Sequence, residues 1–574
     1  MKRIAKYLKG YGKECVLGPL FKMLEATLEL IVPLIIAAIV DRGILPGNPG
    51  YVVRMCLILL LLGAVGLAFS VTAQYFSAKA AVGFVSKLRY ALFEKMQTLS
   101  YSDIDELGTS TMITRMTSDA SKVQNGLNLA LRLLLRSPFV VFGAMIMAFT
   151  VDVKSALTFA AVIPLLSVVV FGIMLITMPL YKKAQRGTDS LLQRTRENLS
   201  GIRVIRAFRN ENTEIARFGE ENDSLTAVQR RVGRISALMN PLTYVLINLA
   251  ILALIHTGAI EVSHGNLTQG EVLALYNYMS QILVELIKLA NLIISISRAL
   301  ASASRIADAL DIVPTENSGS AVSGNNGAPK VEFRSVSLTY NGGSEPSLEN
   351  ISFTAERGQT IGIIGGTGSG KSSLVNLIPA FYKATDGSVL IDGINVGEYR
   401  TDALRERVGV VPQKAVLFSG TIRDNMLWGD QNATDEEIMR CLNVAQAREV
   451  VESKGGLDAM IEQEGRNLSG GQKQRLTIAR ALISKPEILI LDDSASALDY
   501  ATDAALRSAL ASSLNDTTVF IVSQRASSIM HADKIIVLDD GRAVGIGTHE
   551  QLLESCAVYR EIYDTQFTRE VQNG

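Results

Sequence analysis

Long apolar stretches alternate with charged segments over the first half of the chain. A helical bilayer crossing needs about 20 residues, and six stretches approach or exceed that length. They lie near residues 15–40, 53–75, 127–150, 155–180, 236–260 and 271–298. Two connections, 76–126 and 181–235, continue the helical pattern with few breakers before Gly108 and Gly201. The pattern therefore predicts six membrane-spanning helices, some of which extend out of the membrane.

Basic residues gather in these two long connections. The short connections at 41–52, 151–154 and 261–270 contain only Arg42 and Lys154 as Lys or Arg. By the positive-inside tendency, the long connections and both chain termini lie in the cytoplasm of a multi-pass protein of the cell membrane. The basic start of the chain is similar to a signal peptide. The apolar stretch behind it shows no cleavage pattern, so we expect a retained span.

The second half of the chain has a different pattern. A polar segment rich in Gly, Ser and Asn covers 313–330 and predicts a flexible linker. From 331 to 574 strand-like runs alternate with helical stretches, as in a soluble α/β domain. The strand-like runs include Val331–Phe333, Thr360–Ile364, Ser388–Ile391, Ile488–Leu491, Val519–Val522 and Lys534–Leu538. The predicted fold class is multi-domain: a six-helix all-α transmembrane domain over 1–312, then an α/β nucleotide-binding domain.

Composition agrees with a membrane protein and narrows the choice of partners. The 574 residues are 48% hydrophobic and 20% charged, with 56 basic and 56 acidic residues. A net charge of zero gives no global field that would attract nucleic acid. The four cysteines are far apart, which favours neither a disulfide framework nor a zinc site. They are Cys15, Cys56, Cys441 and Cys556.

A glycine-rich segment follows the apolar run Thr360–Ile364 and precedes a helical run over Ser373–Ile378. This order predicts a P-loop, a phosphate-binding loop in which Lys371 reaches the β- and γ-phosphates and the Ser372 hydroxyl ligates Mg²⁺. Asp492 ends another apolar run and is the carboxylate expected to hold Mg²⁺. The predicted cofactors are ATP and Mg²⁺. The residues expected to bind the phosphates are Gly365, Gly366, Thr367, Gly368, Ser369, Gly370, Lys371, Ser372 and Ser373.

The pentapeptide Leu468-Ser469-Gly470-Gly471-Gln472 precedes a helix expected to begin near Lys473. It resembles the signature of ATP-binding cassette (ABC) proteins. Six spans followed by one cassette resemble half-size exporters of this superfamily, with the type IV fold, over the whole chain. The resemblance implies that Ser469, Gly470, Gly471 and Gln472 close over ATP held by another chain, and therefore that the protein dimerises.

The resemblance implies roles for three further positions. Tyr340 would stack on adenine, and Gln413 would bind Mg²⁺ and couple the cassette to the spans. Asp499 would belong to the loop Ser496–Asp499 that faces the partner. Two segments resemble cytoplasmic coupling helices that meet cassette surfaces near Gln413 and Phe418. They are Ser110–Asp119 for the first and Glu197–Phe208 for the second.

Two positions depart from family members that hydrolyse ATP well. Those members have a glutamate after the Mg²⁺ aspartate, to orient the attacking water, where this chain has Asp493. They have a histidine after the next strand, where this chain has Gln524, and His531 lies too far along to replace it. The carboxylate of Asp493 is shorter by one methylene, and a misplacement of about 1 Å can cost about a hundredfold in rate. Gln524 cannot carry a titratable charge. The site is therefore predicted to bind ATP and to hydrolyse it weakly.

These observations favour one half of a heterodimeric ATP-driven exporter that lends its intact signature to the partner's competent site. The predicted partners are a second, homologous half-transporter, the lipid bilayer and a small amphipathic substrate such as a drug, peptide or lipid, with no nucleic acid. Two alternatives stay open: a homodimer with two slow sites, and an importer or regulatory membrane protein on the same fold. A soluble ATPase that acts on nucleic acid is disfavoured by the six spans.

Ionisable residues inside spans are costly and are candidates for function. Pairing that holds the helices together and contact with a ligand are both open for them. These residues are Glu25, Glu29, Arg132, Arg136, Glu285 and Lys288. The sixth span is also unusually polar, with Tyr276, Asn277, Tyr278, Gln281 and Asn291.

Overall fold

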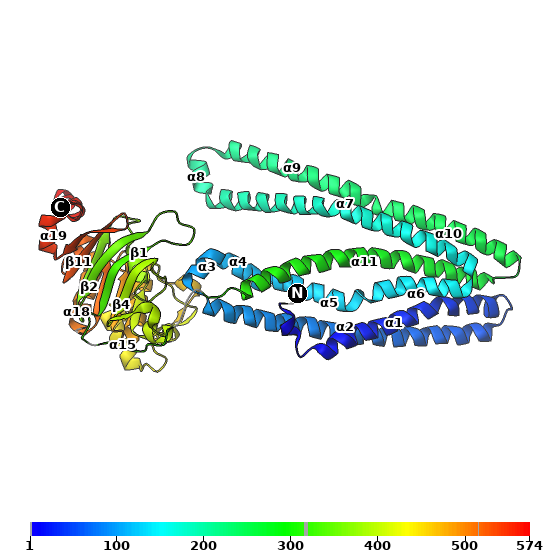
Figure 1. The fold of residues 1–574 in the computed structure, drawn as a ribbon, viewed down its shortest axis with the longest axis horizontal. Helices are drawn as coiled ribbons and strands as arrows, with labels where there is room; N and C mark the ends of the chain where they lie inside the picture. Colours follow the sequence, from blue (N-terminus) through cyan, green and yellow to red (C-terminus); the bar gives the residue numbers. More distant parts are fainter. Residues whose placement is uncertain (1–2, 315–318, 326, 515, 574) are drawn as a thin grey trace. The chain divides into compact units, whose positions relative to one another are not determined.

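The structure is a computed structural model that describes residues 3–314, 319–325, 327–514 and 516–573, with side chains as far as 567. The chain forms two compact units, which we describe separately (Figure 1). The helical unit holds the chain up to Gln97 together with Ser110–Ile312. The cassette unit holds the remainder of the chain from Val313 and also the short segment Thr98–Thr109.

Six helical segments of the described chain are long and apolar enough to cross a membrane, which confirms the six predicted spans. They cover Gly12–Ile44, Pro49–Thr98, Thr109–Val151, Val153–Ser200, Glu211–Ser263 and Gln269–Leu310. The second helix has 50 residues. At about 1.5 Å per residue it is far longer than a hydrocarbon core of about 30 Å. The long charged connections therefore continue as helix, as their pattern predicts.

The helices of the helical unit pack in two groups. Helices α7 and α9 run side by side to the short helix α8, away from α11 (Figure 1). Helix α11 packs against α1, α5 and α6. Buried Phe159 of α7 packs in one core with Tyr278 and Ile282 of α11, so this core joins the two groups. The helices are α1 (Gly12–Ile39), α2 (Pro49–Thr98), α4 (Thr109–Thr114), α5 (Ala120–Leu133), α6 (Arg136–Val151), α7 (Val153–Ser200), α8 (Ile202–Ala207), α9 (Glu211–Ala237), α10 (Met239–Ser263) and α11 (Gln269–Leu310).

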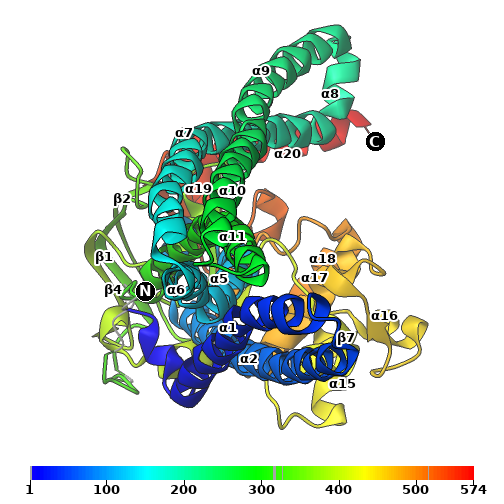
Figure 2. The same ribbon diagram turned by 90° about the vertical axis from the view of Figure 1, so that its right-hand side faces the viewer.

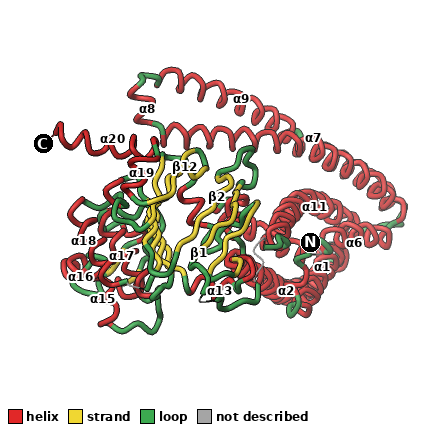
Figure 3. Tube along the Cα trace, turned by 60° about the vertical axis from the view of Figure 1, so that its left-hand side comes forward, coloured by secondary structure: helices red, strands yellow, loops and turns green. Residues whose placement is uncertain are grey.

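The cassette unit contains two principal sheets (Figure 3). The larger has the order β12-β11-β3-β10-β9-β6, parallel except at β12, and the smaller is antiparallel with the order β2-β1-β4-β5. The strands are β1 (Val331–Leu338), β2 (Leu348–Ala355), β3 (Thr360–Gly365), β4 (Asp386–Ile391), β5 (Ile394–Asn395), β6 (Val408–Val411), β9 (Ile488–Asp492), β10 (Thr518–Val522), β11 (Lys534–Asp539) and β12 (Arg542–Gly547), with a separate pair β7 (Gly420–Thr421) and β8 (Met460–Ile461). Each predicted strand-like run lies in one of these strands.

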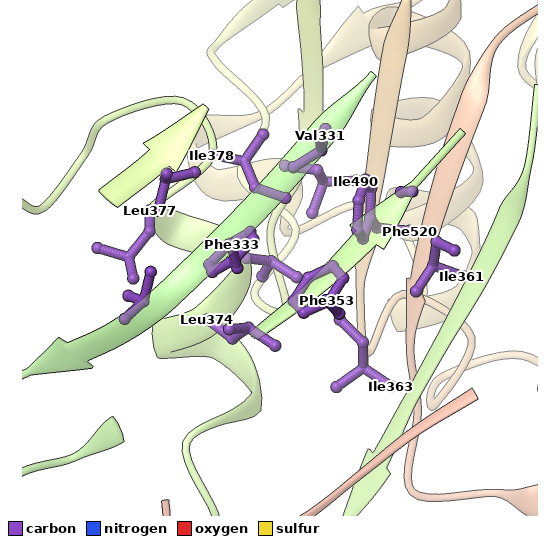
Figure 4. Packing of buried hydrophobic residues seen from close by; sticks show 14 of the residues in the cluster. Val331, Phe333, Phe353, Ile361, Ile363, Leu374, Leu377, Ile378, Ile490 and Phe520 are labelled. Carbon is purple, nitrogen blue, oxygen red and sulfur yellow. The ribbon is translucent and has the colours of Figure 1, made fainter. Parts of the chain in front are cut away.

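A hydrophobic core joins the two sheets. Phe333 and Phe353 stack with their ring centroids 4.5 Å apart, and the apolar side chains of β3 and β10 pack with them (Figure 4). Burying an aromatic or aliphatic side chain of this size contributes about 1.5–3 kcal/mol. The alternation of buried and exposed positions along β1 and β2 turns one face of the smaller sheet into this core.

Helices surround the sheets and carry a second core. Helices α15 to α18 lie on the side of the cassette unit away from β1, β2 and β4 (Figure 2). Leu442, Ile478 and Leu506 of these helices pack in one buried cluster with Leu491 of β9. The helices of this unit are α3 (Tyr101–Leu107), α12 (Lys371–Asn376), α13 (Thr401–Glu406), α14 (Ile422–Met426), α15 (Asp435–Val444), α16 (Arg448–Lys454), α17 (Gly470–Ile483), α18 (Tyr500–Ser513), α19 (His549–Ser555) and α20 (Ala557–Asn573).

Part of the predicted flexible linker is bound to the cassette. The backbone N–H of Ala321 donates to the carbonyl of Glu398, and the N–H of Arg400 donates to the carbonyl of Ala321, at 3.0 and 2.8 Å. The N–H of Asn325 donates to the carbonyl of Asp392 at 2.8 Å. The described residues 319–325 therefore run as an extra extended segment along the cassette. The polar composition predicts no helix or strand, which is why it indicated a flexible linker. The hydrogen-bond partners that hold this segment lie about 70 residues further along the chain, where a local pattern does not reveal them. Residues 315–318 and 326 lie outside the described residues.

Candidate functional site

The parallel register of the larger sheet brings the predicted site residues to one edge. Val522 of β10 pairs with Ile363 of β3 on one side and with Asp492 of β9 on the other. Val411 at the end of β6 pairs with Leu491 of β9. The carboxyl ends of these four strands therefore meet at the same edge. Ligands bind at this edge in open α/β sheets.

The glycine-rich segment forms a tight loop between β3 and α12. Gly368 and Gly370 have φ of 86° and 92°, in the left-handed region that favours glycine. A Cβ on Gly370 would also lie 2.6 Å from the carbonyl oxygen of Ser347. The loop ends at the N-terminus of α12, where free backbone N–H groups favour an anion. Local conformation and helix position thus agree with the predicted P-loop.

Lys371 lies over this loop. Its Nζ donates to the carbonyl oxygens of Gly365 and Gly366 at 2.9 and 2.6 Å, and it is 3.4 Å from the hydroxyl of Ser369. Burial lowers the pKa of the Lys371 ammonium, while the carboxylates of Asp493 and Asp492 oppose this shift. The lysine therefore presents a partly desolvated positive charge, which strengthens its attraction for phosphate oxygens.

Ser372 and Asp492 form the predicted metal pair. The Ser372 hydroxyl donates to Oδ1 of Asp492 at 3.0 Å. Burial raises the pKa of the Asp492 carboxyl, and the neighbouring charge of Asp493 adds to the rise. Two neighbouring carboxylates, one of them buried, favour the binding of a cation between or beside them. Hydroxyl, carboxylate and amide oxygens are the ligands that Mg²⁺ prefers, so Ser372, Asp492 and Gln413 fit the predicted metal.

The two departing residues lie at the same pocket. Residues that line it include Thr367, Gly368, Gly370, Lys371, Ser372, Ser373, Gln413, Asp492, Asp493 and Gln524. Asp493 is half-buried, and its Oδ2 accepts from Nε2 of Gln413 at 3.3 Å. Its φ of 45° is left-handed, a conformation that aspartate tolerates better than most residues. Gln524 is exposed at the end of β10. Both side chains are therefore within the phosphate pocket.

The signature residues are built differently from the P-loop. Ser469 is the N-cap of α17: its hydroxyl accepts from the N–H of Gln472 at 3.3 Å, and its own N–H donates to Oε1 of Gln472 at 2.9 Å. The helix begins at Gly470, three residues before the predicted start near Lys473, because the capping box of Ser469 and Gln472 defines its first turn. A Cβ on Gly471 would lie 3.0 Å from the carbonyl oxygen of Ala497. The signature thus packs against the loop Ser496–Asp499.

Several predicted residues do not line the phosphate pocket formed by the described chain. Ser469, Gly470, Gly471 and Gln472 are absent from its lining, and so is Asp499. Asp499 caps α18, where its carboxylate accepts from the N–H and the hydroxyl of Thr502, both at 2.8 Å. Tyr340 lies outside as well, and its hydroxyl donates to Ser373 at 2.9 Å. Its ring meets Tyr382 edge-on, 5.0 Å between centroids. Tyr340 is therefore next to the P-loop helix, while the signature faces elsewhere.

A short helix just before the predicted first coupling segment packs on the cassette. Helix α3 belongs to the cassette unit: Tyr101 stacks on Phe381 at 4.4 Å, and the hydroxyl of Tyr382 donates to Asp105 at 2.6 Å. The predicted contact of Ser110–Asp119 with cassette surfaces near Gln413 and Phe418 stays a prediction. Residues 110–119 belong to the helical unit, where Asp119 pairs with Arg305.

Sequence reasoning also missed Ser347, which lines the phosphate pocket from the turn before β2. Its carbonyl oxygen is the atom that excludes a side chain at Gly370. No motif marks Ser347, because it reaches the pocket through the pairing of strands and not through the loop sequence.

Four of the predicted charges inside the spans, Glu29, Arg136, Glu285 and Lys288, form one network. Arg136 on α6 contacts Glu29 on α1 at 2.5 Å and Glu285 on α11 at 2.6 Å. The Ser137 hydroxyl and Lys288 both donate to Glu285, at 2.9 Å each. This network joins three spans, so internal pairing explains these residues. Removing one partner of a buried pair typically costs about 3–5 kcal/mol. Contact with a ligand stays a prediction.

A second pair lies in the first span, where Lys22 donates to Glu25 at 2.5 and 2.7 Å and to the hydroxyl of Ser70 on α2 at 3.2 Å. This ammonium therefore joins α1 to α2, and it too satisfies a charge within the described spans.

Comparison with known proteins gives two family matches. Residues 15–286 match the ABC transporter transmembrane region, and residues 348–496 match the ABC transporter family that describes the cassette. The chain is 35% identical to an uncharacterized ABC transporter ATP-binding protein, YfiB, of Bacillus subtilis, over 99% of both proteins. It is 30% identical to a putative multidrug export ATP-binding/permease protein, YgaD, of the same organism, over 99% of both.

Two more relatives extend the comparison. An ATP-dependent lipid A-core flippase of Desulfotalea psychrophila is 32% identical over 84% of both proteins. The solved structure of a bacterial Atm1-family ABC exporter with ATP bound has the same fold, with a TM-score of 0.81, 23% identity, and coverage of 97% of this chain and 99% of that one. Six spans, a P-loop cassette and matches over the whole length agree: the chain belongs to the ABC transporter family, as a half-size member with one transmembrane region and one ATP-binding cassette.

Proposed function

We propose that the chain is one half of a heterodimeric exporter driven by ATP. Its own P-loop forms a site that binds ATP and hydrolyses it weakly, and its signature completes the competent site of a homologous partner. The observation that carries the proposal is the pair Asp493 and Gln524 at the phosphate pocket. There the family's efficient members use glutamate and histidine.

The site keeps what ATP binding needs. Lys371 and the loop N–H groups bind phosphate oxygens, and Ser372, Asp492 and Gln413 would hold Mg²⁺, which neutralises phosphate charge when bound. Phosphoryl transfer depends mostly on such positioning and charge. ATP is therefore expected to stay bound at this site.

Hydrolysis needs a carboxylate that also reaches the attacking water. Two hydrogen bonds fix the backbone of Asp493. Its N–H donates to the carbonyl of Val522 at 3.0 Å, and its carbonyl accepts from the hydroxyl of Ser496 at 2.8 Å. The left-handed backbone and these two contacts leave little freedom to advance the carboxylate. A glutamine at 524 can donate to a phosphate oxygen but cannot take up a proton. Binding without fast turnover is the result.

The signature supports a role in trans. Ser469, Gly470, Gly471 and Gln472 do not line the described phosphate pocket of their own chain. The N-terminus of α17, with its 14 residues, instead presents the free N–H groups that favour an anion. A γ-phosphate held by a second chain matches this chemistry. Asp499, at the end of the neighbouring loop, would face the same partner.

The substrate is proposed to be amphipathic, and transport to run out of the cytoplasm with both termini and the cassette on the cytoplasmic side. The names of relatives support this class, since one is called a multidrug export protein and another a lipid A-core flippase. Accumulation of a fluorescent amphipathic drug in inside-out vesicles, with ATP and with or without a candidate partner, tests the direction. Equal accumulation without ATP would refute active export.

The heterodimer is tested by reconstituting the chain alone in lipid nanodiscs. Weak ATP turnover is expected, together with retained ATP binding that the Lys371→Met variant abolishes. Strong, cooperative hydrolysis by the chain alone would refute the division of labour and favour a homodimer. Co-reconstitution with a half-transporter that carries glutamate and histidine at the two positions should raise turnover sharply.

A further inference from the structure

The last helix of the cassette contacts the segment that carries Gln524. We call Ser523–Ser528 the switch loop. The side-chain amide of Gln566 on α20 makes two hydrogen bonds to its backbone: Oε1 accepts from the N–H of Ala526, and Nε2 donates to the carbonyl of Gln524, both at 2.8 Å. The single side chain of Gln566 thus binds the backbone of the switch loop at two positions, Gln524 and Ala526.

Helix α20 provides a firm base for this contact. It packs beside α19 and β11 (Figure 3). Tyr559 is fully buried, and its hydroxyl lies 2.7 Å from Nδ1 of His549. One helical turn on, Tyr563 packs against Phe567 with the rings tilted by 30° and their centroids 4.3 Å apart. Residues 559, 563 and 566 share one face of the helix by their spacing. Gln566 therefore extends from the face of α20 that is fixed to the core.

The opposite side of the switch loop is held by α18 and by the loop before it. Arg507 donates to the carbonyl of Ser527 at 2.8 Å, and the hydroxyl of Ser528 donates to Asp503 at 3.1 Å. Arg525 donates to the carbonyls of Leu498 and Ser496, both at 3.4 Å. These contacts hold the second half of the loop, beyond Gln524. The bond from Gln566 acts on the carbonyl of Gln524 itself.

We propose that Gln566 is a positioning residue for the ATP site: it fixes the backbone of Gln524 so that the Gln524 side chain stays directed at the terminal phosphate of ATP. Gln566 acts only through the switch loop and does not line the described phosphate pocket. The inference goes beyond the proposed function, because it concerns ATP binding by this chain's own site and holds for a heterodimer and for a homodimer.

The physical consequence is specific for ATP. Gln524 lines the phosphate pocket, and in this proposal its side chain binds the phosphate that ADP lacks. Losing two neutral hydrogen bonds loosens the loop, and such bonds contribute enough that affinity for ATP should fall about threefold to tenfold. Affinity for ADP should not change. A general loss of stability would affect both nucleotides.

The test uses the full-length transporter in lipid nanodiscs. Labelling of this chain by 8-azido-ATP reports its own site, and competition by ATPγS and by ADP gives the two dissociation constants. The Gln566→Ala variant should weaken ATPγS and leave ADP unchanged. The matched control is Thr565→Ala, because Thr565 neighbours Gln566 but is exposed, and its hydroxyl donates to the carbonyl of Glu561 in its own helix. It should behave as the unsubstituted protein.

A double-mutant cycle with Gln524→Ala separates positioning from general destabilisation. If Gln566 acts through Gln524, the change Gln566→Ala should have no further effect on ATPγS binding once Gln524 is alanine. Additive effects of the two changes, or an equal loss of ATPγS and ADP binding, would overturn the proposal.

A second variant covers the case in which Gln566→Ala does not fold. Gln566→Glu keeps the acceptor for Ala526 but cannot donate to the carbonyl of Gln524. It should weaken ATPγS selectively, and unchanged ATPγS binding in this variant would also overturn the proposal.

Discussion

Lengthening the carboxylate at position 493 by one methylene should accelerate hydrolysis at this ATP site. In the Asp493→Glu variant the backbone stays fixed by its bonds to Val522 and Ser496. The carboxylate therefore advances by about one C–C bond, ~1.5 Å. Its contact with Gln413 is only 3.3 Å long, so little is lost when the carboxylate leaves it.

The size of the effect follows from two separate free energies. A misplacement of about 1 Å costs about a hundredfold in rate, which corresponds to about 2.7 kcal/mol of activation free energy. The left-handed φ of 45° at this position suits glutamate less well than aspartate, at a cost within the range of about 1–2 kcal/mol for that conformation. This strain is present before and during the reaction, so it lowers folding stability and leaves the rate constant unaffected. We expect kcat at this site to rise about tenfold to a hundredfold while the unfolding temperature falls slightly.

The assay measures single-turnover hydrolysis of ATP bound to this chain in nanodiscs, since steady-state turnover of a dimer is dominated by its faster site. The control is Asp493→Asn, which keeps the length and removes the charge, and it should be slower than the unsubstituted chain. Adding Gln524→His to Asp493→Glu should increase the rate further. If Asp493→Glu is no faster and Asp493→Asn is no slower, the carboxylate has no part in directing the water.

Three further predictions concern the cassette. Lys371→Met should abolish ATP binding, measured by 8-azido-ATP labelling, because it removes the charge that contacts the phosphates; retained labelling would contradict the assignment of the loop. Asp392→Asn should destabilise the cassette by about 3–5 kcal/mol, because the fully buried carboxylate of Asp392 pairs with Lys330 and two arginines. In scanning calorimetry the unfolding temperature of the cassette should fall by about 10 °C. The control is Asp402→Asn, which breaks an exposed pair with one arginine that contributes little to stability. Equal shifts in the two variants would contradict the role of the buried cluster. The hydrogen bond from Arg407 lowers the pKa of Glu487 from 4.5 to about 2. The ionised Glu487 therefore stabilises the fold above pH 4.5, and this stabilisation is lost as the pH falls toward 2. Glu487→Gln should reduce the fall of the unfolding temperature between pH 4.5 and 2, and an unchanged fall would contradict this role of Glu487.

Local patterns predicted the elements of the ATP site well. The order of apolar run, glycine-rich loop and helix was enough to locate Lys371 and Ser372, and the end of a buried strand was enough to locate Asp492. The structure brings them together because parallel strands align their carboxyl ends. The signature helix was predicted to start too late, since its first turn is defined by the reciprocal bonds of Ser469 and Gln472. The apolar periodicity of this helix begins after its first turn, so it does not reveal these two bonds.

Prediction was poorer wherever a residue depends on a distant partner. Nothing in the local pattern predicted the contact of Tyr101 with Phe381, which joins α3 to the cassette unit, and the coupling role of Ser110–Asp119 stays a prediction. The charged residues of the spans were visible in the sequence, but either pairing or ligand contact fitted them. Arg136 is paired with Glu29 and Glu285, which lie on helices far from it in the chain.

The sequence by itself determined the six spans, the P-loop, the signature and the two departures at Asp493 and Gln524, because each is a property of residue type and short-range spacing. Only the tertiary structure decided the left-handed backbone of Asp493, the contact of α3 with the cassette, and the two bonds from Gln566 to the switch loop. These features join residues that are distant along the chain. They arise from strand register and helix packing, whose energies depend on which surfaces come into contact. A local pattern of apolar and polar positions does not determine which surfaces these are.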